Sequence, residues 1–192
     1  MKLAGVVVLY NPDQKVLDNI SSYIDELDVL YLVDNSNADN SKFFLNDKFE
    51  YIPLLKNTGI AHALNVGAKK ALDSNYKYLL TMDQDSKFES DALKNMKNII
   101  DNDIDKDNVG IYSPFHKTAI SDPVPSELFT SPLVVMTSGN IINLDIYKCV
   151  EGFKEWMFID CVDFEYGLNV RKHGYTICLL YTSDAADELD GV

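Results

Sequence analysis

The chain has 192 residues, of which 46% are hydrophobic and 24% charged, enough for one packed domain and unlike a disordered protein. Its 17 basic and 30 acidic residues give a net charge of −13, which argues against nucleic-acid binding through a basic face. Three cysteines without zinc-ligand spacing are typical of a reducing compartment. With no early apolar run long enough for a membrane span or shaped like a secretory leader, we expect a cytoplasmic protein, or one peripheral at the inner face of the cell membrane.

Strand and helix patterns alternate through the first half of the chain. The expected strands are short apolar runs that end in loop-forming residues, and the expected helices carry apolar residues at helical spacing. This alternation predicts an α/β fold with a mostly parallel central sheet and helices on both faces. We expect strands at Ala4–Tyr10, Val29–Val33, Tyr51–Leu55, Tyr78–Met82 and Val109–Ser113, and helices at Lys15–Leu27, 57–72 and 90–100.

The second half is less regular. A proline-punctuated loop at 114–132 precedes an expected strand at Leu133–Thr137, a helix at 162–173 and a strand at Tyr175–Leu180. Residues 1–180 then form a single domain. Residues 181–192 lack apolar periodicity and contain four acids and no base. This ending resembles adapter-derived read-through, so we expect a disordered or non-native tail on a domain truncated at its C-terminus.

Polar residues follow three of the expected strands. They are Tyr10-Asn11, Asp34-Asn35 and Asp83-Gln84-Asp85, and ligands of open α/β sheets bind beyond the carboxyl ends of the strands. The turn after the first strand, 9–13, contains no glycine, so neither a P-loop nor a dinucleotide fingerprint is available to hold phosphate. A bound nucleotide would need another source of positive charge.

Asp83 and Asp85 are candidate metal ligands. Two carboxylates two residues apart, just past a strand, can bind one hard cation, which in turn binds diphosphate oxygens. The alternative interpretation is a pair of solvated, turn-forming acids at a strand end.

Asp160, Asp163 and Glu165 form a second acidic group, at the start of an expected helix. Neighbouring carboxylates raise one another's pKa, as a general base requires. The alternative is helix capping and compensation of the helix dipole, at about 0.3–1 kcal/mol for each interaction.

Two glycine-containing segments have equally open interpretations. Gly59, in Asn57-Thr58-Gly59, either lets the backbone approach a ligand or simply starts a helix. Ser138-Gly139-Asn140 is either part of a ligand site or only a turn.

Taken together, these segments resemble the inverting family 2 glycosyltransferases of GT-A fold, most closely their bacterial rhamnosyltransferase-like branch. The resemblance covers residues 4–180, and its motifs occur in the order of the family. The matching segments are Val7-Val8-Leu9-Tyr10-Asn11-Pro12, Val33-Asp34-Asn35-Ser36, Asn57-x-Gly59-Ile60-Ala61-x-Ala63-x-Asn65-x-Gly67, Leu80-Thr81-Met82-Asp83-Gln84-Asp85-Ser86, Ser138-Gly139-Asn140, Glu151-Gly152-Phe153, and Asp160-x-x-Asp163-x-Glu165-x-Gly167-Leu168 with Arg171 and Gly174-Tyr175.

The resemblance implies a role for each candidate residue. Asp163 would be the catalytic base, with Asp160 and Glu165 as neighbours that orient it or contact the acceptor. Asp85, with Asp83, would bind Mg²⁺ or Mn²⁺ on the donor diphosphate. The implied donor-binding residues are Tyr10, Asn11, Asp34 (to the base or ribose), Asn57, Gly59, Ala61, Asn65 and Asp83, and the implied acceptor-binding residues are Ser138, Gly139 and Asn140.

The implied reaction is transfer of a sugar, for example L-rhamnose, from a dTDP- or UDP-sugar to a saccharide or lipid-linked acceptor in bacterial surface polysaccharide synthesis. Family members often have a further histidine metal ligand after the helix near Asp163; no histidine follows His173 here, so we expect weak donor binding or no activity in this chain. The alternatives are a non-catalytic nucleotide-binding or assembly domain, and a nucleotidyltransferase, although a nucleotidyltransferase usually needs a glycine-rich first loop.

Overall fold

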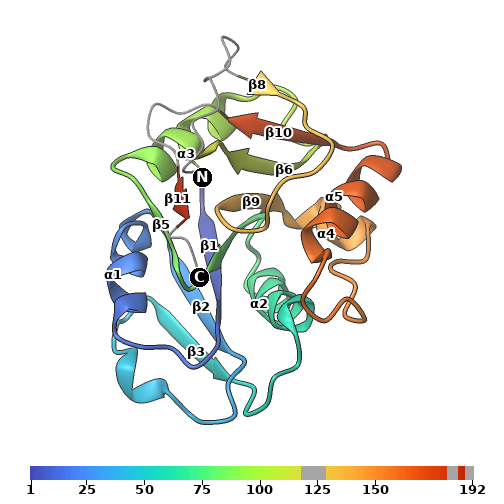
Figure 1. Cartoon of the computed structure of the whole chain (residues 1–192). Coiled ribbons are helices and arrows are strands. Elements are labelled where there is room, and N and C mark those ends of the chain that lie inside the picture. The colour runs from blue at the N-terminus through green and yellow to red at the C-terminus, as the bar shows by residue number, and fades with distance from the viewer. Residues whose placement is uncertain (118–128, 181–185, 189–192) are drawn as a thin grey trace.

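The computed structural model describes residues 1–117, 129–180 and 186–188 (Figure 1). In these residues the main sheet has eight strands, in the order β3-β2-β1-β4-β9-β6-β10-β8. Their bounds are β1 Leu3–Leu9, β2 Val29–Asp34, β3 Phe49–Pro53, β4 Tyr78–Asp83, β6 Val109–Pro114, β8 Phe129–Thr130, β9 Asn140–Asn143 and β10 Thr176–Leu180. A smaller sheet joins β5 (Ser86–Phe88), β11 (Ala186–Glu188) and β7 (His116–Lys117).

Parallel pairing dominates the main sheet, as predicted. Strand β1 pairs in parallel with β2 and β4, β2 with β3, and β6 with β10. Strand β9 runs antiparallel between β4 and β6, and β8 is antiparallel to β10. The predicted α/β class, with a mostly parallel sheet, is therefore confirmed.

Helices cover both faces of the sheet (Figure 1). Helices α1 (Lys15–Ser21) and α3 (Ala92–Asn102) pack on one face, and α2 (Ile60–Asp73), α4 (Leu144–Cys149) and α5 (Val162–Lys172) pack on the other. Because side chains alternate along a strand, β1 contributes Val7 and Leu9 to the first core and Val6 and Val8 to the second. This two-sided burial explains why the strand reads as a continuous apolar run.

A glycine brings α2 close to the sheet. A Cβ atom at Gly67 would lie 2.3 Å from Cγ2 of Val6, so any larger residue would push the helix away from β1. The close contact fixes the position of the first turn of α2, which lies at the carboxyl edge of the sheet.

The predicted strand at Leu133–Thr137 is wrong. Its residues are irregular and at least partly exposed, and they pair with no strand among the described residues. The chain instead forms β9 and α4, which the analysis of the sequence missed. Strand β9 has only two apolar residues, and it is held in place by pairing with β4 and β6 on either side.

Other predicted boundaries move by a few residues. The helix expected over Lys15–Leu27 ends at Ser21 and is followed by a short 3-10 helix, η1 (Ile24–Glu26). The hydroxyls of Ser21 and Ser22 donate to the carbonyls of Asp18 and Asn19, a local alternative to further helix. The third strand lies at Phe49–Pro53 rather than Tyr51–Leu55, because Leu55 adopts φ 56° and ends the extended run.

Two further predictions fall partly outside the described residues. Of the loop at 114–132, residues 118–128 lie outside them, and of the expected tail at 181–192 only Ala186–Glu188, which form β11, are described. In the described part of the chain, no helix is both long and apolar enough to cross a bilayer.

Candidate functional site

The carboxyl ends of three adjacent parallel strands form one edge of the sheet. Leu9 of β1 pairs with Asp34 of β2, and Val8 pairs with Asp83 of β4, so the segments that follow these strands lie side by side. Together with the start of α2 they enclose a cavity of about 300 Å³, which we call the donor cavity after the role that the sequence resemblance implies for its residues. Five predicted site residues line it: Tyr10, Asn57, Gly59, Asp83 and Asp85.

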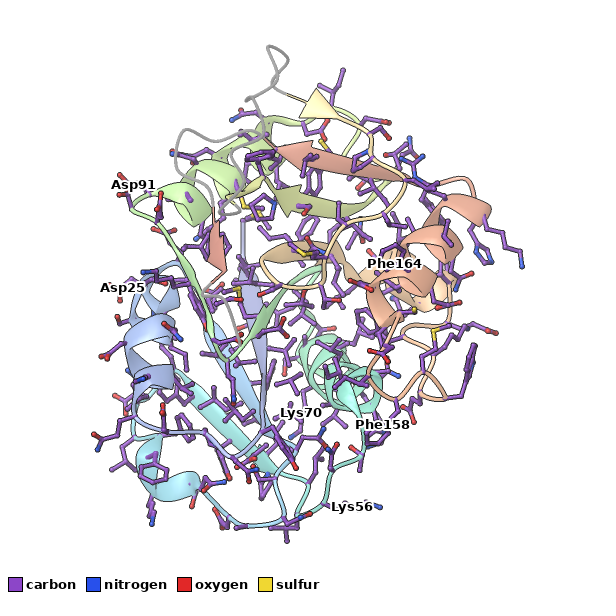
Figure 2. All side chains as sticks on the ribbon, in the orientation of Figure 1. Asp25, Lys56, Lys70, Asp91, Phe158 and Phe164 are labelled. Atoms are coloured by element: carbon purple, nitrogen blue, oxygen red, sulfur yellow. The ribbon has the colours of Figure 1, made fainter. Side chains whose placement is uncertain are left out.

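A second cavity, of about 350 Å³, adjoins the first, and we call it the acceptor cavity after the role that the resemblance implies for Asp160 and Asp163. Asp83, Ile60 and Ile159 line both cavities, and Asp160 and Asp163 line the second. Figure 2 shows Phe158 beside α2 and Phe164 on α5. Phe158 lines the donor cavity and Phe164 lines the acceptor cavity. Three of the predicted acids thus meet around one space.

A larger cavity of about 780 Å³ lies at the opposite edge of the sheet, where β6 and β10 begin. None of the predicted site residues lines it. Size alone therefore does not identify the functional site.

The turn that bears Asp83 and Asp85 joins β4 to β5. The backbone N–H of Asp83 donates to the hydroxyl of Ser138 at 3.1 Å, and Asn19 of α1 donates to the carbonyl of Gln84 at 2.9 Å. One bond comes from the segment before β9 and the other from α1, and together they fix the turn. Asp83 is half-buried and Asp85 is exposed, and both face the donor cavity.

The donor set at this turn fits a divalent cation that is shared with a ligand. Among the described residues there is no group of three His, Cys, Asp or Glu that could hold a metal on its own. Mg²⁺ is commonly bound by one or two carboxylates together with substrate phosphates, rather than by a complete protein cage. Two carboxylates on one turn at the mouth of a cavity agree with that arrangement.

Asp34 is only 1% exposed and lies behind the donor cavity. Its Oδ2 accepts from the hydroxyl of Tyr51 at 2.5 Å and from Nδ2 of Asn40 at 2.8 Å, and its Oδ1 accepts from the N–H of Ser36 at 2.9 Å. Burial, together with the Asp34 hydrogen bond, raises the pKa of Tyr51. Asp34 does not line the cavity, so its contact with a donor stays a prediction that requires Tyr51 or Asn40 to give way.

The neighbouring Asn35, expected only as a polar residue at a strand end and given no role in the site, lines the cavity. Its Nδ2 donates to Oδ1 of Asn57 at 3.0 Å, and its Oδ1 accepts from the N–H of Thr58 at 2.7 Å. Oδ1 of Asn57 also accepts from the N–H of Gly59 at 3.0 Å. Asn35 and Asn57 therefore fix the loop that enters α2.

Gly59 permits the close approach of another backbone segment. It adopts φ 87°, and a Cβ there would lie 2.4 Å from the carbonyl oxygen of Phe158. That oxygen accepts from the N–H of Ile60 at 2.8 Å, so the segment with Phe158 and Ile159 rests on the start of α2. The sequence left two interpretations of Gly59, close approach to a ligand or a simple helix start. In the structure its backbone does make a close approach, but to Phe158 of the same chain.

Replacing Gly59 with alanine is expected to lower the free energy of unfolding by about 1–3 kcal/mol, because both the backbone conformation and the Phe158 contact become strained. Urea unfolding checks this. Gly174→Ala is the matched control, since Gly174 has a similar φ of 85° but open space around its Cβ. Equal losses in the two variants would contradict the role given to the Phe158 contact.

Three other predicted donor residues do not line the cavity. Asn11 is exposed beside it, with φ 47° and its N–H donating to Ser36, and Ala61 is buried in the core. Asn65 supports the segment that leads to Phe158: it donates to the carbonyl of Phe153 and the carboxylate of Glu155, and accepts from Tyr147. Their contact with a donor stays a prediction.

Asp163 lies in the first turn of α5, facing the acceptor cavity. Cys161, at φ 62°, turns the chain immediately before the helix, and Asp160 is exposed on the approach to it. Oδ1 of Asp163 accepts from the N–H of Phe164 at 2.8 Å. The second carboxylate oxygen is thus available to a ligand without disturbing this bond.

Ser138, Gly139 and Asn140 are buried beneath the acceptor cavity rather than lining it. Ser138 holds Asp83, the N–H of Gly139 donates to the carbonyl of Thr81, and Nδ2 of Asn140 donates to the carbonyl of Met136 at 2.5 Å. The preceding residues, Met136 and Thr137, do line it. The three predicted acceptor residues support the site from below in this structure.

Glu165 lies in the same turn of α5 as Asp163 but lines neither cavity. Its Oε2 is buried without a hydrogen-bond partner among the described residues, and burial raises the pKa of the carboxyl group, opposed by Lys154 and Lys172. Its role as a catalytic neighbour stays a prediction.

Glu165→Gln is expected to raise the melting temperature by about 1–2 °C at pH 7.5, because it removes a carboxylate whose charged form burial disfavours. With the pKa raised in the folded state, the folded protein binds more protons, so the contribution of Glu165 to stability falls as pH rises through that pKa. The gain should therefore vanish near pH 4. Thermal unfolding at both pH values checks this, with the exposed Glu151→Gln as control; a gain unchanged at pH 4 would contradict it.

This chain is similar to known proteins both in sequence and in fold. It is 27% identical over 199 residues to the dTDP-rhamnosyl transferase RfbF of Shigella flexneri, covering 92% of this chain and 65% of that protein. It is 30% identical over 99 residues to a poly-beta-1,6-N-acetyl-D-glucosamine synthase of Staphylococcus epidermidis, covering 47% of this chain and 23% of that protein. The chain thus spans less than two thirds of the length of either relative.

Solved structures share the fold. GalNAc-T7, crystallised with UDP, GalNAc and Mn²⁺, matches 100% of this chain and 44% of its own with a TM-score of 0.79 at 11% identity. TarS of S. aureus matches 99% of this chain and 37% of its own with a TM-score of 0.70 at 19% identity. These matches confirm the predicted GT-A fold.

A family model described as glycosyl transferase family 2 matches residues 6–129. Because that match covers more than half of the sequence, the chain belongs to glycosyl transferase family 2.

Proposed function

We propose that this protein transfers a sugar from a nucleoside-diphosphate donor to a hydroxyl of a saccharide or lipid-linked acceptor, with inversion at the anomeric carbon, in bacterial surface polysaccharide synthesis. The observation that carries the proposal is the meeting of two cavities at Asp83. One contains the Asp83–Asp85 turn and the other contains Asp163. A donor and an acceptor could thus react across one shared boundary.

The donor side has the features that a nucleoside diphosphate needs. Tyr10 and the Asn35–Asn57 pair offer a planar ring and amide groups for the nucleoside, while the two carboxylates face the same cavity. We propose Asp85 and Asp83 as ligands of Mg²⁺ or Mn²⁺, which when bound would neutralise charge on the departing diphosphate. The rhamnosyl transferase relative favours dTDP-L-rhamnose as donor, with a UDP-sugar as the alternative.

Asp163 is the proposed general base. Its carboxylate accepts the proton of the acceptor hydroxyl as the oxygen attacks the anomeric carbon and the bond from that carbon to the diphosphate oxygen breaks. One displacement inverts the configuration, and it requires no covalent intermediate on the enzyme. We assign Asp160 a contact with the acceptor, because it is exposed and lines the same cavity.

The surroundings of the acceptor cavity favour a lipid-linked acceptor over a free saccharide. Met136 and Phe164 line it and also line a third cavity of about 250 Å³, whose other residues are almost all apolar. An acceptor with a sugar beside Asp163 and an apolar portion in the third cavity would bury apolar surface on binding.

Nucleotide binding tests the proposal. In thermal unfolding with Mn²⁺, dTDP or UDP is expected to raise the melting temperature, since a ligand at 100 times its dissociation constant adds about 2.7 kcal/mol of stability. EDTA should abolish the rise. The matching dTDP- or UDP-sugar is then assayed for transfer by mass spectrometry. Because weak donor binding is expected of this chain, each nucleotide is raised until its effect saturates; no stabilisation by either nucleotide would contradict the proposal.

A further inference from the structure

Gln84, the residue between the two acids, makes a two-bond contact with the end of β1. Its Oε1 accepts from the backbone N–H of Tyr10 at 2.9 Å, and its Nε2 donates to the backbone carbonyl of Tyr10 at 3.1 Å. Only an amide of this length can both accept and donate in this pattern. The turn that bears Asp83 and Asp85 is thereby joined directly to Tyr10.

Tyr10 needs such a contact to hold its place. It lies one residue beyond β1, where regular pairing ends, and the next residue, Asn11, has a left-handed φ of 47°. The residue is 47% exposed, so packing alone does not fix it. Gln84 supplies partners for the N–H and C=O that the strand no longer pairs.

The other side of Gln84 is fixed as well. Its own carbonyl accepts from Asn19 at 2.9 Å, and Asn19 is a buried residue of α1. Gln84 itself lines the donor cavity together with Tyr10, Asp83 and Asp85. The side-chain amide of Gln84 therefore sets the distance between Tyr10 and the two carboxylates, Asp83 and Asp85.

We propose that Gln84 is a positioning residue for donor binding. It acts through the backbone of Tyr10 and holds Tyr10, the proposed nucleoside contact, at a fixed distance from Asp83 and Asp85. The inference rests on the proposed function, because it assigns the cavity to a nucleoside diphosphate. It concerns binding of the donor rather than the chemical step, so the KM for the donor should change and kcat should change little.

The test compares Gln84→Leu and Gln84→Asn with Gln14→Leu in the full chain. Leucine has the size of glutamine without its polar atoms, and asparagine is one methylene too short to span both Tyr10 groups. Gln14 is exposed, and its side chain caps no helix N–H, which makes it a matched control. Each variant is titrated with dTDP and UDP in the presence of Mn²⁺, and amide exchange at Tyr10 is followed by NMR.

Both Gln84 variants are expected to raise the nucleotide dissociation constant by about tenfold and to speed amide exchange at Tyr10, with melting temperatures near wild type. Gln14→Leu should change neither. A folded Gln84 variant that binds nucleotide with the wild-type affinity would overturn the positioning role and leave the proposed function standing. A wild-type chain that binds neither nucleotide would reject both.

Discussion

Asp163→Asn is expected to lower the rate of sugar transfer by about 10²–10⁴-fold while leaving nucleotide affinity unchanged. Asparagine keeps the shape of the side chain, and its Oδ1 can still accept from the N–H of Phe164, but it cannot take a proton from the acceptor. Asp163 lines the acceptor cavity and not the donor cavity, so binding of the donor should not depend on it. Transfer rates and dTDP or UDP titrations of the same preparations measure the two effects separately.

Asp160→Asn is the matched control, because Asp160 lines the same cavity and the substitution removes the same charge. We expect a smaller loss of transfer, expressed in the KM for the acceptor. Equal transfer rates in wild type and Asp163→Asn would reject Asp163 as the base. They would also favour the interpretation in which Asp163 only compensates the dipole at the start of α5.

Asp85→Ala is expected to weaken Mn²⁺-dependent binding of dTDP or UDP by at least about tenfold. The physical reason is the charge of this protein: with a net charge of −13, it repels a diphosphate unless a cation stands between them. Asp85 is exposed at the donor cavity, so its removal should disturb the fold little. Isothermal titration with and without Mn²⁺ gives the comparison.

Asp91→Ala serves as the control for Asp85→Ala. Asp91 is an exposed acid before α3, away from both cavities, and its removal changes the net charge by the same amount (Figure 2). Affinity should stay at the wild-type value in this variant. If the two variants bind nucleotide equally well, the acid pair does not hold a cation for the diphosphate.

The first half of the fold could be predicted from the sequence because its strands are buried on both faces. Such strands read as unbroken apolar runs, and the polar residues where they end mark the edge at which Tyr10, Asp83 and Asp85 meet. The motif at Asn57 and Gly59 lies at the same edge, since it begins the helix that packs on β1. Local pattern and tertiary structure agree here.

Elements that depend on their neighbours could not be predicted. Strand β9 has an asparagine at each end and two isoleucines between, and only the gap between β4 and β6 makes it a strand. The apolar segment at Leu133–Thr137 looked more like a strand, but no strand pairs with it. Hydrophobic pattern alone does not specify pairing partners.

The same limit applies to the site. Gln84 and Asn35 lie inside motifs that the sequence analysis quoted, but their roles depend on contacts with Tyr10 and Asn57, 74 and 22 residues away. Phe158 and Ile159 reach the donor cavity because a carbonyl rests on the start of α2. For Asp34, the sequence position suggested a donor contact that the structure does not show. Its carboxylate lies at a strand end but accepts hydrogen bonds from Tyr51 and Asn40.

Anomalous diffraction at the manganese edge, from crystals soaked with Mn²⁺ and dTDP or UDP, is the most direct test of the cation site. We expect one strong peak at the mouth of the donor cavity, within about 2.5 Å of a carboxylate oxygen of Asp85 and of the diphosphate. A nucleotide bound in that cavity with no manganese at Asp85 or Asp83, or a nucleotide bound elsewhere on the protein, would contradict it.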